Sequence, residues 1–262
     1  MNTSIILAFD AAASIEDQVA EITSARRLGK RVLAIVEAPA ANAREALARA
    51  NAMPATTDVH VQAWVRLAPA RVAAMELRAA LDLPDPEAAL LTAQTPVVRG
   101  PALDAEGRTV SARALERGWA LNPVVVLPAG VALTEDRRPA IVADGSALST
   151  ALLFAERLAI PLRLLRPHLE PLTGFVSLDY DDALALSPRD RRPLLFARIH
   201  RVPFVIASSA NAHTEADRPP PISIGRETAR AGTRPVATSR VGRLSDREPQ
   251  FQLDRARARV SA

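Results

Sequence analysis

Asp144, Gly145 and Ser146 form the turn whose residue types are best suited to hold a ligand. The turn follows a short apolar run and opens a helical pattern, so it lies at the carboxyl end of a predicted strand. Ligands of open α/β sheets bind at such ends, and the N-terminus of a helix attracts anions. A tight turn followed by a helix N-cap uses the same residue types. The sequence therefore leaves two interpretations, a binding site and a purely structural turn.

A cluster of carboxylates at 179–182 (Asp-Tyr-Asp-Asp) offers a second kind of chemistry. Such a cluster could hold Mg²⁺ for phosphoryl transfer. A solvated turn is the favoured interpretation, because no lysine or hydroxyl motif accompanies it. Lys30, the only lysine, lies between a predicted helix and a predicted strand, which reverses the order found in a P-loop. The histidines have no metal-binding spacing, and the chain has no cysteine. We predict no catalytic residue and no metal site.

The elements that position these residues alternate between strands and helices in the first half of the chain. Such alternation predicts a parallel sheet with right-handed crossovers and helices on both faces. Apolar runs, helical periodicity and turn residues predict strands over 5–10, 31–36, 57–67, 88–93 and 123–127, and helices over 15–28, 42–51, 70–81 and from Thr109 or Ser111 to 120.

A second half is predicted to begin near residue 138. A strand, the turn at Asp144, a helix and another strand repeat the pattern that opens the chain. The pattern then shortens, with a helix over 191–200 and a final strand over 202–207. The predicted fold is α/β, with two tandem open parallel-sheet (Rossmann-like) halves, 1–130 and a truncated 138–211. Residues 212–262 have little apolar periodicity, so we predict a disordered, Arg-rich tail.

Charge and composition limit the partners. From residue 215 onward ten arginines face six acidic residues, and the remainder of the chain is neutral. The tail lacks interleaved aromatic residues, so nucleic acid is not the expected partner. No stretch is apolar and long enough to span a bilayer, and no signal peptide is recognised. We predict a soluble, cytoplasmic protein without membrane contact.

The two halves together resemble the universal stress protein family in its tandem form. The resemblance rests on a strand that ends in an acid in each half (Asp10, Asp144), the Asp-Gly-Ser turn, and the terminal strands Pro123-Val-Val-Val-Leu127 and Val202-Pro-Phe-Val-Ile-Ala207. It implies a ligand site at Asp10, Asp144, Gly145 and Ser146, with Gly100, Gly107 and Thr109 in the phosphate loop.

The glycine spacing departs from that family's phosphate loop. Phosphate cradling needs backbone N–H groups that a ligand can approach at glycine positions, and only Gly100 and Gly107 precede Thr109 here. The resemblance implies a non-enzymatic module for ligand sensing or protein interaction, with degenerate binding of ATP or another adenine nucleotide. An ATP-binding member of the family and a structural subunit anchored by its Arg-rich tail are the alternatives. A homodimer or a complex with a partner protein is expected, and a small-molecule ligand fits the same architecture.

Overall fold

A computed structural model of the 262-residue chain shows an α/β protein built on one large sheet. All described residues lie in one compact unit, Met1–Thr228. None of the helices among them is both long and apolar enough to cross a membrane. The described residues are 3–83, 98–99, 109–110, 112–133, 139–141, 145–167, 177–187, 190–208 and 221–225.

Seven strands form the main sheet in the order β5-β2-β1-β8-β10-β11-β9. The first five are parallel, whereas β11 runs antiparallel to β10 and β9 runs parallel to β11. The strands are β1 (Ser4–Phe9), β2 (Arg31–Val36), β5 (Val124–Pro128), β8 (Leu162–Leu165), β9 (Ser177–Leu178), β10 (Phe204–Ala207) and β11 (Ile222–Ile224). The parallel α/β sheet predicted from strand–helix alternation is confirmed.

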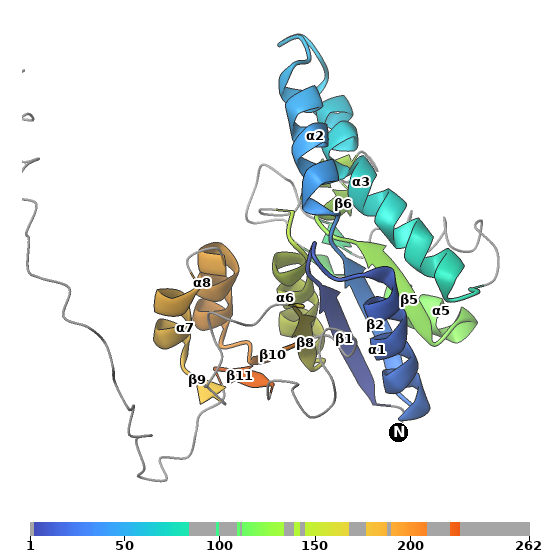
Figure 1. Cartoon of the computed structure of the whole chain (residues 1–262), viewed down its shortest axis with the longest axis vertical. Coiled ribbons are helices and arrows are strands. Elements are labelled where there is room, and N and C mark those ends of the chain that lie inside the picture. Colours follow the sequence, from blue (N-terminus) through green and yellow to red (C-terminus); the bar gives the residue numbers. More distant parts are fainter. Residues whose placement is uncertain are drawn as a thin grey trace, which may run out of the picture. The chain divides into compact units, whose positions relative to one another are not determined.

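A smaller sheet and seven described helices complete the fold (Figure 1). The smaller sheet has the order β4-β3-β6-β7, from β3 (Val98–Arg99), β4 (Thr109–Val110), β6 (Val131–Leu133) and β7 (Pro139–Ile141). The helices are α1 (Ile15–Arg27), α2 (Ala40–Asn51), α3 (Val59–Ala80), α5 (Ala112–Leu121), α6 (Ala147–Leu158), α7 (Tyr180–Leu186) and α8 (Arg191–His200).

Side-chain alternation along the central strand β1 divides the core into two layers. Ile5, Leu7 and Phe9 are buried together with residues of α1 and α3. Ile6 and Ala8 point to the other face, where they are buried with residues of α5, α6 and α8. Successive side chains of a strand point to opposite faces, so a strand covered on both sides reads as a continuous apolar run.

The sheet does not divide into two tandem halves. Strand β1 pairs with β8 along its length, from Ile6 opposite Leu162 to Phe9 opposite Leu165. Strands from both predicted halves therefore share one hydrogen-bonded sheet, and the prediction of two successive sheets is wrong. The strand β11 is a second correction, because it lies inside the predicted disordered tail and pairs with β10.

The predicted strand over 57–67 is part of helix α3 instead. Alternating valines suggested a strand, but the alternation extends over few residues. Buried positions farther along follow the helical spacing, with Leu67, Ala70, Ala74 and Leu77 facing the core. Asp58 begins the helix, since its side chain accepts a hydrogen bond from the backbone N–H of His60 at 2.8 Å. The strand predicted over 88–93 lies outside the described residues.

Candidate functional site

Polar residues follow four neighbouring parallel strands at the same edge of the sheet. Phe9 is in register with Val36 on one side and with Leu165 on the other, and Leu165 is in register with Ala207. The next residue on each strand is polar, which brings the following four to one edge: Asp10, Glu37, Arg166 and Ser208. The order of the strands reverses direction between β1 and β8. Ligands of open α/β sheets bind outside the carboxyl ends at such a reversal.

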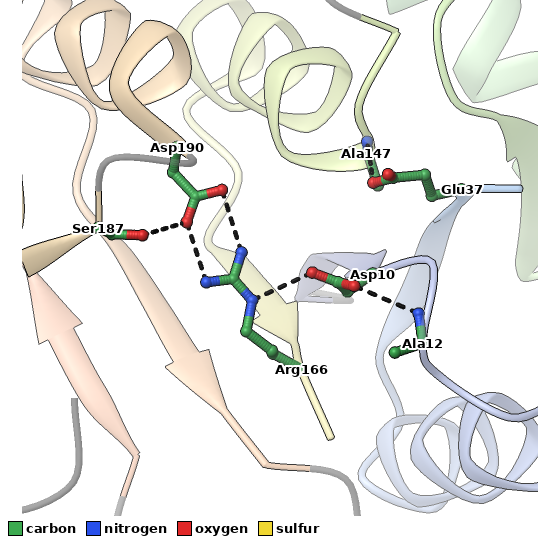
Figure 2. A network of polar contacts seen from close by, with 7 residues as sticks. All are labelled: Asp10, Ala12, Glu37, Ala147, Arg166, Ser187 and Asp190. Atoms are coloured by element: carbon green, nitrogen blue, oxygen red, sulfur yellow. Dashed lines mark hydrogen bonds and ion pairs between the residues drawn. The ribbon is translucent and has the colours of Figure 1, made fainter. Parts of the chain in front are cut away.

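Arg166 lies at the centre of this edge and bonds two buried carboxylates (Figure 2). Its Nε donates to Oδ2 of Asp10 at 3.1 Å, and its two terminal nitrogens donate to the two oxygens of Asp190 at 2.9 and 3.1 Å. Ser187 donates its hydroxyl to the same Asp190 at 2.6 Å. The planar fork of a guanidinium matches a carboxylate in two parallel bonds, which fixes the orientation of both groups.

The electrostatics of Arg166 follow from these contacts. Burial by itself would lower the pKa of the guanidinium, because it disfavours the charged form. Hydrogen bonds and negative charge from Asp190 and Asp10 outweigh burial and raise the pKa above its ordinary value. Arg166 is therefore a permanent cation that is compensated by the protein's own acids.

A second carboxylate occupies the N-terminus of helix α6. Glu37 accepts a hydrogen bond from the backbone N–H of Ala147 at 3.1 Å (Figure 2). Ser146 is the N-cap of the same helix, and its hydroxyl accepts from the N–H of Ser149 at 3.1 Å. Helix N-termini attract negative groups because their first N–H groups lack partners within the helix. Here Glu37 supplies that negative group from within the chain.

Two glycines allow the loop before α6 to approach the end of β5. Gly130 and Gly145 both have positive φ, 74° and 79°. A Cβ atom on Gly130 would lie 2.7 Å from the Cα of Gly145, so a larger residue does not fit at this contact. Thr150 reinforces it, since its hydroxyl accepts from the N–H of Gly130 at 2.9 Å.

The structure places some of the predicted site residues at the carboxyl edge of the main sheet and others elsewhere. Asp10 lies at the carboxyl edge, where its Oδ1 accepts from the N–H of Ala12 at 3.2 Å. Ser146 and Gly145 lie beside Glu37 and Gly130, as described above. Thr109 lies in the short strand β4, apart from the main sheet, and not at the start of the following helix. Asp144, Gly100 and Gly107 lie outside the described residues.

Two of the three carboxylates of 179–182 have structural partners. Asp179 is the N-cap of α7, with Oδ1 accepting from the N–H of Asp182 at 2.8 Å. Asp181 forms an exposed ion pair with Arg198 at 2.9 Å. Within the described parts of the chain, no group of three or more acids and histidines could hold a metal ion.

Sequence reasoning missed Glu37, Arg166, Asp190 and Ser187. Two of these carried a signal, because Glu37 and Arg166 are charged residues directly after apolar strands of a parallel sheet. Asp190 and Ser187 have no comparable signal. They reach the edge only because α8 begins beside β8, which no local pattern indicates.

Comparisons with known proteins place this geometry in a recognised fold. No protein family matches the sequence, and no curated protein matches it. Solved structures do match. An aspartate kinase from Synechocystis has a TM-score of 0.57 at 16% identity, over 85% of this chain and 39% of that one. N-acetylglutamate synthase from Neisseria gonorrhoeae, complexed with coenzyme A and L-arginine, has a TM-score of 0.57 at 14% identity, over 86% of this chain and 62% of that one.

A third match is of similar length to this chain. UMP kinase from Ureaplasma parvum has a TM-score of 0.54 at 12% identity, over 86% of this chain and 99% of that one. The chain thus spans less than two thirds of the aspartate kinase and the synthase, and nearly all of the UMP kinase. At these identities the likeness shows the fold alone, which is the amino acid kinase fold.

The resemblance to universal stress proteins is therefore wrong, and so is the stress-protein module that it implied. The adenine nucleotide that it also implied is compatible with the fold, because an aspartokinase III from E. coli with this fold was solved in complex with ADP. The features that carried it, a strand ending in an acid and an apolar terminal strand, are shared by many parallel α/β sheets. The pairing of β1 with β8 places strands of both predicted halves in one sheet, and that pairing leaves no local mark in the sequence.

Proposed function

We propose that this chain is a small-molecule-binding protein with a regulatory role, and that its ligand binds at the carboxyl ends of β1, β2 and β8. The observation that supports this proposal most directly is the occupation of the edge by internal carboxylates. Glu37 takes the N–H of Ala147, and Asp10 and Asp190 take the guanidinium of Arg166. The N–H of Ala147 and the guanidinium of Arg166 are the donors that a phosphate group would need.

Phosphoryl transfer is less compatible with this arrangement. Enzymes that transfer a phosphoryl group neutralise its oxygens with cations placed beside it. Arg166 bonds two carboxylates, and Lys30, the only lysine, immediately precedes β2 at the opposite end of the parallel sheet. A phosphate would have to displace Asp10, Asp190 or Glu37 from partners that already satisfy them. This cost favours a regulatory role over a catalytic one.

The ligand proposed is a free amino acid. Asp10, Glu37 and Asp190 outnumber Arg166 at this edge, so the excess negative charge attracts the ammonium group of an amino acid and repels a triphosphate. Proteins that share the fold supply the precedent for this ligand class: an aspartokinase III from E. coli binds aspartate and ADP, and the N-acetylglutamate synthase binds L-arginine. The second candidate is an adenine nucleotide, favoured by the ADP in that aspartokinase complex.

Thermal unfolding in the presence of defined ligands tests the proposal. A ligand that binds only the native state stabilises it by RT ln(1 + [L]/Kd), so the melting temperature rises with ligand concentration. We expect at least one amino acid from a panel of the twenty common ones to stabilise the protein. We expect no comparable shift with ATP or ADP and Mg²⁺, and no transfer of labelled phosphate from ATP to an amino acid.

Matched variants locate the site. Glu37→Gln keeps the size of the side chain and removes its charge at the edge, so it should reduce the amino-acid shift. Glu116→Gln removes the charge of an exposed acid that pairs with Arg31 elsewhere on the sheet, so it should leave the shift unchanged. The proposal is overturned if none of the twenty amino acids stabilises the protein. It is also overturned if the protein transfers phosphate from ATP.

A further inference from the structure

Four helices of the protein end at the same edge of the main sheet. Helices α1, α5, α6 and α8 lead into the parallel strands β2, β5, β8 and β10, each through a loop of two or three residues. These strands belong to one parallel array, so the ends of the four helices meet where the strands begin. We name the last turns of these helices and the loops after them the amino edge: residues 24–30, 118–123, 155–161 and 197–203.

The amino edge is strongly basic. It contains six arginine and lysine residues and a single acid, Glu156, which pairs with Arg157 at 3.2 Å. Arg198 pairs with Asp181 of α7. The other four cations form no ion pair with a described acid: Arg26, Arg27, Lys30 and Arg201. Cations are favoured near the C-termini of helices by the helix dipole, so the charge by itself does not indicate a partner.

Exposed aliphatic side chains at the amino edge are a second, independent observation. Leu28, Leu121 and Ile199 are 69%, 77% and 74% exposed, and they are the three most exposed large apolar side chains that the structure describes. They lie at the ends of helices on both faces of the sheet, because α1 packs on one face and α5 and α8 pack on the other. Single exposed apolar residues are common on protein surfaces. The gathering of the three most exposed ones at one basic edge requires a separate explanation, since none of them is buried in the core.

We infer that the amino edge is a docking surface for a membrane that contains anionic phospholipid. Anionic head groups attract lysine and arginine side chains close to the membrane surface. An aliphatic side chain that projects between the head groups leaves water for an apolar environment, which adds to the attraction. Both kinds of side chain must then be interspersed, and they are: Leu28 lies between Arg27 and Lys30, and Ile199 lies two positions before Arg201.

The arrangement fits a lipid surface better than a protein or a nucleic acid. A protein interface has a contiguous apolar centre inside a polar rim, whereas the three aliphatic residues here belong to three helices on two faces of the sheet. Proteins that bind single-stranded nucleic acid present aromatic side chains on which bases stack, and Trp119, the only tryptophan, tyrosine or phenylalanine of the amino edge, is buried. A fluid layer of lipid requires no fixed spacing between the side chains that enter it.

Docking at the amino edge leaves the opposite edge of the sheet open to water. Asp10 and Arg166 follow the carboxyl ends of the same strands, about 20 Å away for a strand of the length of β1. A small molecule can therefore reach the carboxyl edge while the protein is bound to a membrane. The sequence predicts no membrane contact because no segment is suited to span a bilayer, and a peripheral contact requires no such segment.

Co-sedimentation of the full chain with lipid vesicles tests the inference. We expect binding to vesicles of phosphatidylcholine mixed with phosphatidylglycerol and little binding to phosphatidylcholine alone. Added salt should weaken the binding, because it screens exposed charges. Leu121→Gln removes an aliphatic side chain without a change of charge and should weaken binding by about tenfold. Arg27→Gln removes one positive charge and should weaken binding by about fivefold.

Leu47→Gln and Arg44→Gln are the matched controls. Both residues are exposed on α2, which follows the carboxyl end of β2 and so lies away from the amino edge (Figure 1). These two variants should bind anionic vesicles as the unchanged protein does. All four exchanged residues are exposed, so the variants should keep the fold.

A fluorescent probe locates the contact on the protein. The chain contains no cysteine, so Leu28→Cys provides a single site for a polarity-sensitive dye. The emission of the dye should shift to the blue on anionic vesicles, whereas the same dye on Leu47→Cys should show no shift.

Several results would overturn the inference. They are a failure to bind anionic vesicles, equal binding to neutral vesicles, and an equal shift of the dye at both positions. Normal binding by both Leu121→Gln and Arg27→Gln would place the contact outside the amino edge. Binding to polyglutamate or to single-stranded DNA in place of vesicles would assign the edge to a different class of partner.

Discussion

Arg166 and Asp10 are 156 residues apart in the sequence and form a buried ion pair at 3.1 Å. The contact links the ends of β1 and β8 at the point where the strand order reverses. Asp190, at the start of α8, holds the other side of the same guanidinium. The three residues thus join the first strand of the chain to its C-terminal part.

Replacement of Arg166 by alanine should destabilise the protein by about 3–5 kcal/mol. The change leaves Asp10 and Asp190 buried without their cation, and uncompensated buried charge is the main source of the loss. Arg166→Lys keeps the charge but cannot make the two parallel bonds to Asp190, so its loss should be smaller. Unfolding in urea at neutral pH measures the loss of stability in both variants.

Arg198→Ala is the control for the Arg166 variants. Its ion pair with Asp181 is exposed at both partners, 51% and 71%, so its removal should cost no more than about 1 kcal/mol. Equal losses for Arg198→Ala and Arg166→Ala would show that the buried network is not a major source of stability.

Gly130→Ala should destabilise the protein more than Gly29→Ala. Both glycines have positive φ, 74° and 71°, so either substitution incurs about 1–2 kcal/mol of backbone strain. A Cβ at Gly130 also collides with the backbone of Gly145, whereas nothing lies within 4 Å of a Cβ at Gly29. The difference between the two unfolding free energies measures the close contact beside α6. No difference would mean that the loop before α6 moves away freely.

The ionisation of Tyr180 should lower the stability of the folded protein at alkaline pH. Burial raises the pKa of its hydroxyl, so the folded state holds this proton more tightly than the unfolded state. The resulting stability is fully present below the ordinary tyrosine pKa of about 10 and is lost as pH rises through the folded-state pKa. Tyr180 is the only tyrosine in the chain, so absorbance of the tyrosinate reports its ionisation without interference.

Tyr180→Phe is the matching variant. The hydroxyl is buried and has no hydrogen-bond partner among the described residues, so its removal should be neutral or slightly stabilising at pH 7. The variant should also lose less stability than the unchanged protein between neutral and strongly alkaline pH. A titration midpoint at or below the ordinary value would contradict the burial of this group.

Much of the local structure could be predicted from the sequence. Apolar runs located β1, β2, β5 and β10, because strands covered on both faces must be apolar throughout. Ser146 was expected before a helix, since a hydroxyl before a helical pattern satisfies a free backbone N–H, and Ser14 caps α1 in the same way. Asp10 and Ser146 lie at the carboxyl ends of the strands, where the sequence predicts a ligand site.

The tertiary structure alone decided which strands are neighbours and which charges meet. The pairing of β1 with β8 depends on contacts between segments about 155 residues apart, and backbone hydrogen bonds between strands carry no residue code. For the same reason Arg166 could not be assigned to Asp190 or Asp10 from its position in the sequence. The valines near the start of α3 show another limit of local sequence patterns. Their alternation fits a strand, and only the packing of the whole segment 59–80 against the core selects a helix. The sequence therefore determined most of the elements and which residues follow the strands, whereas the fold determined which charges meet at that edge.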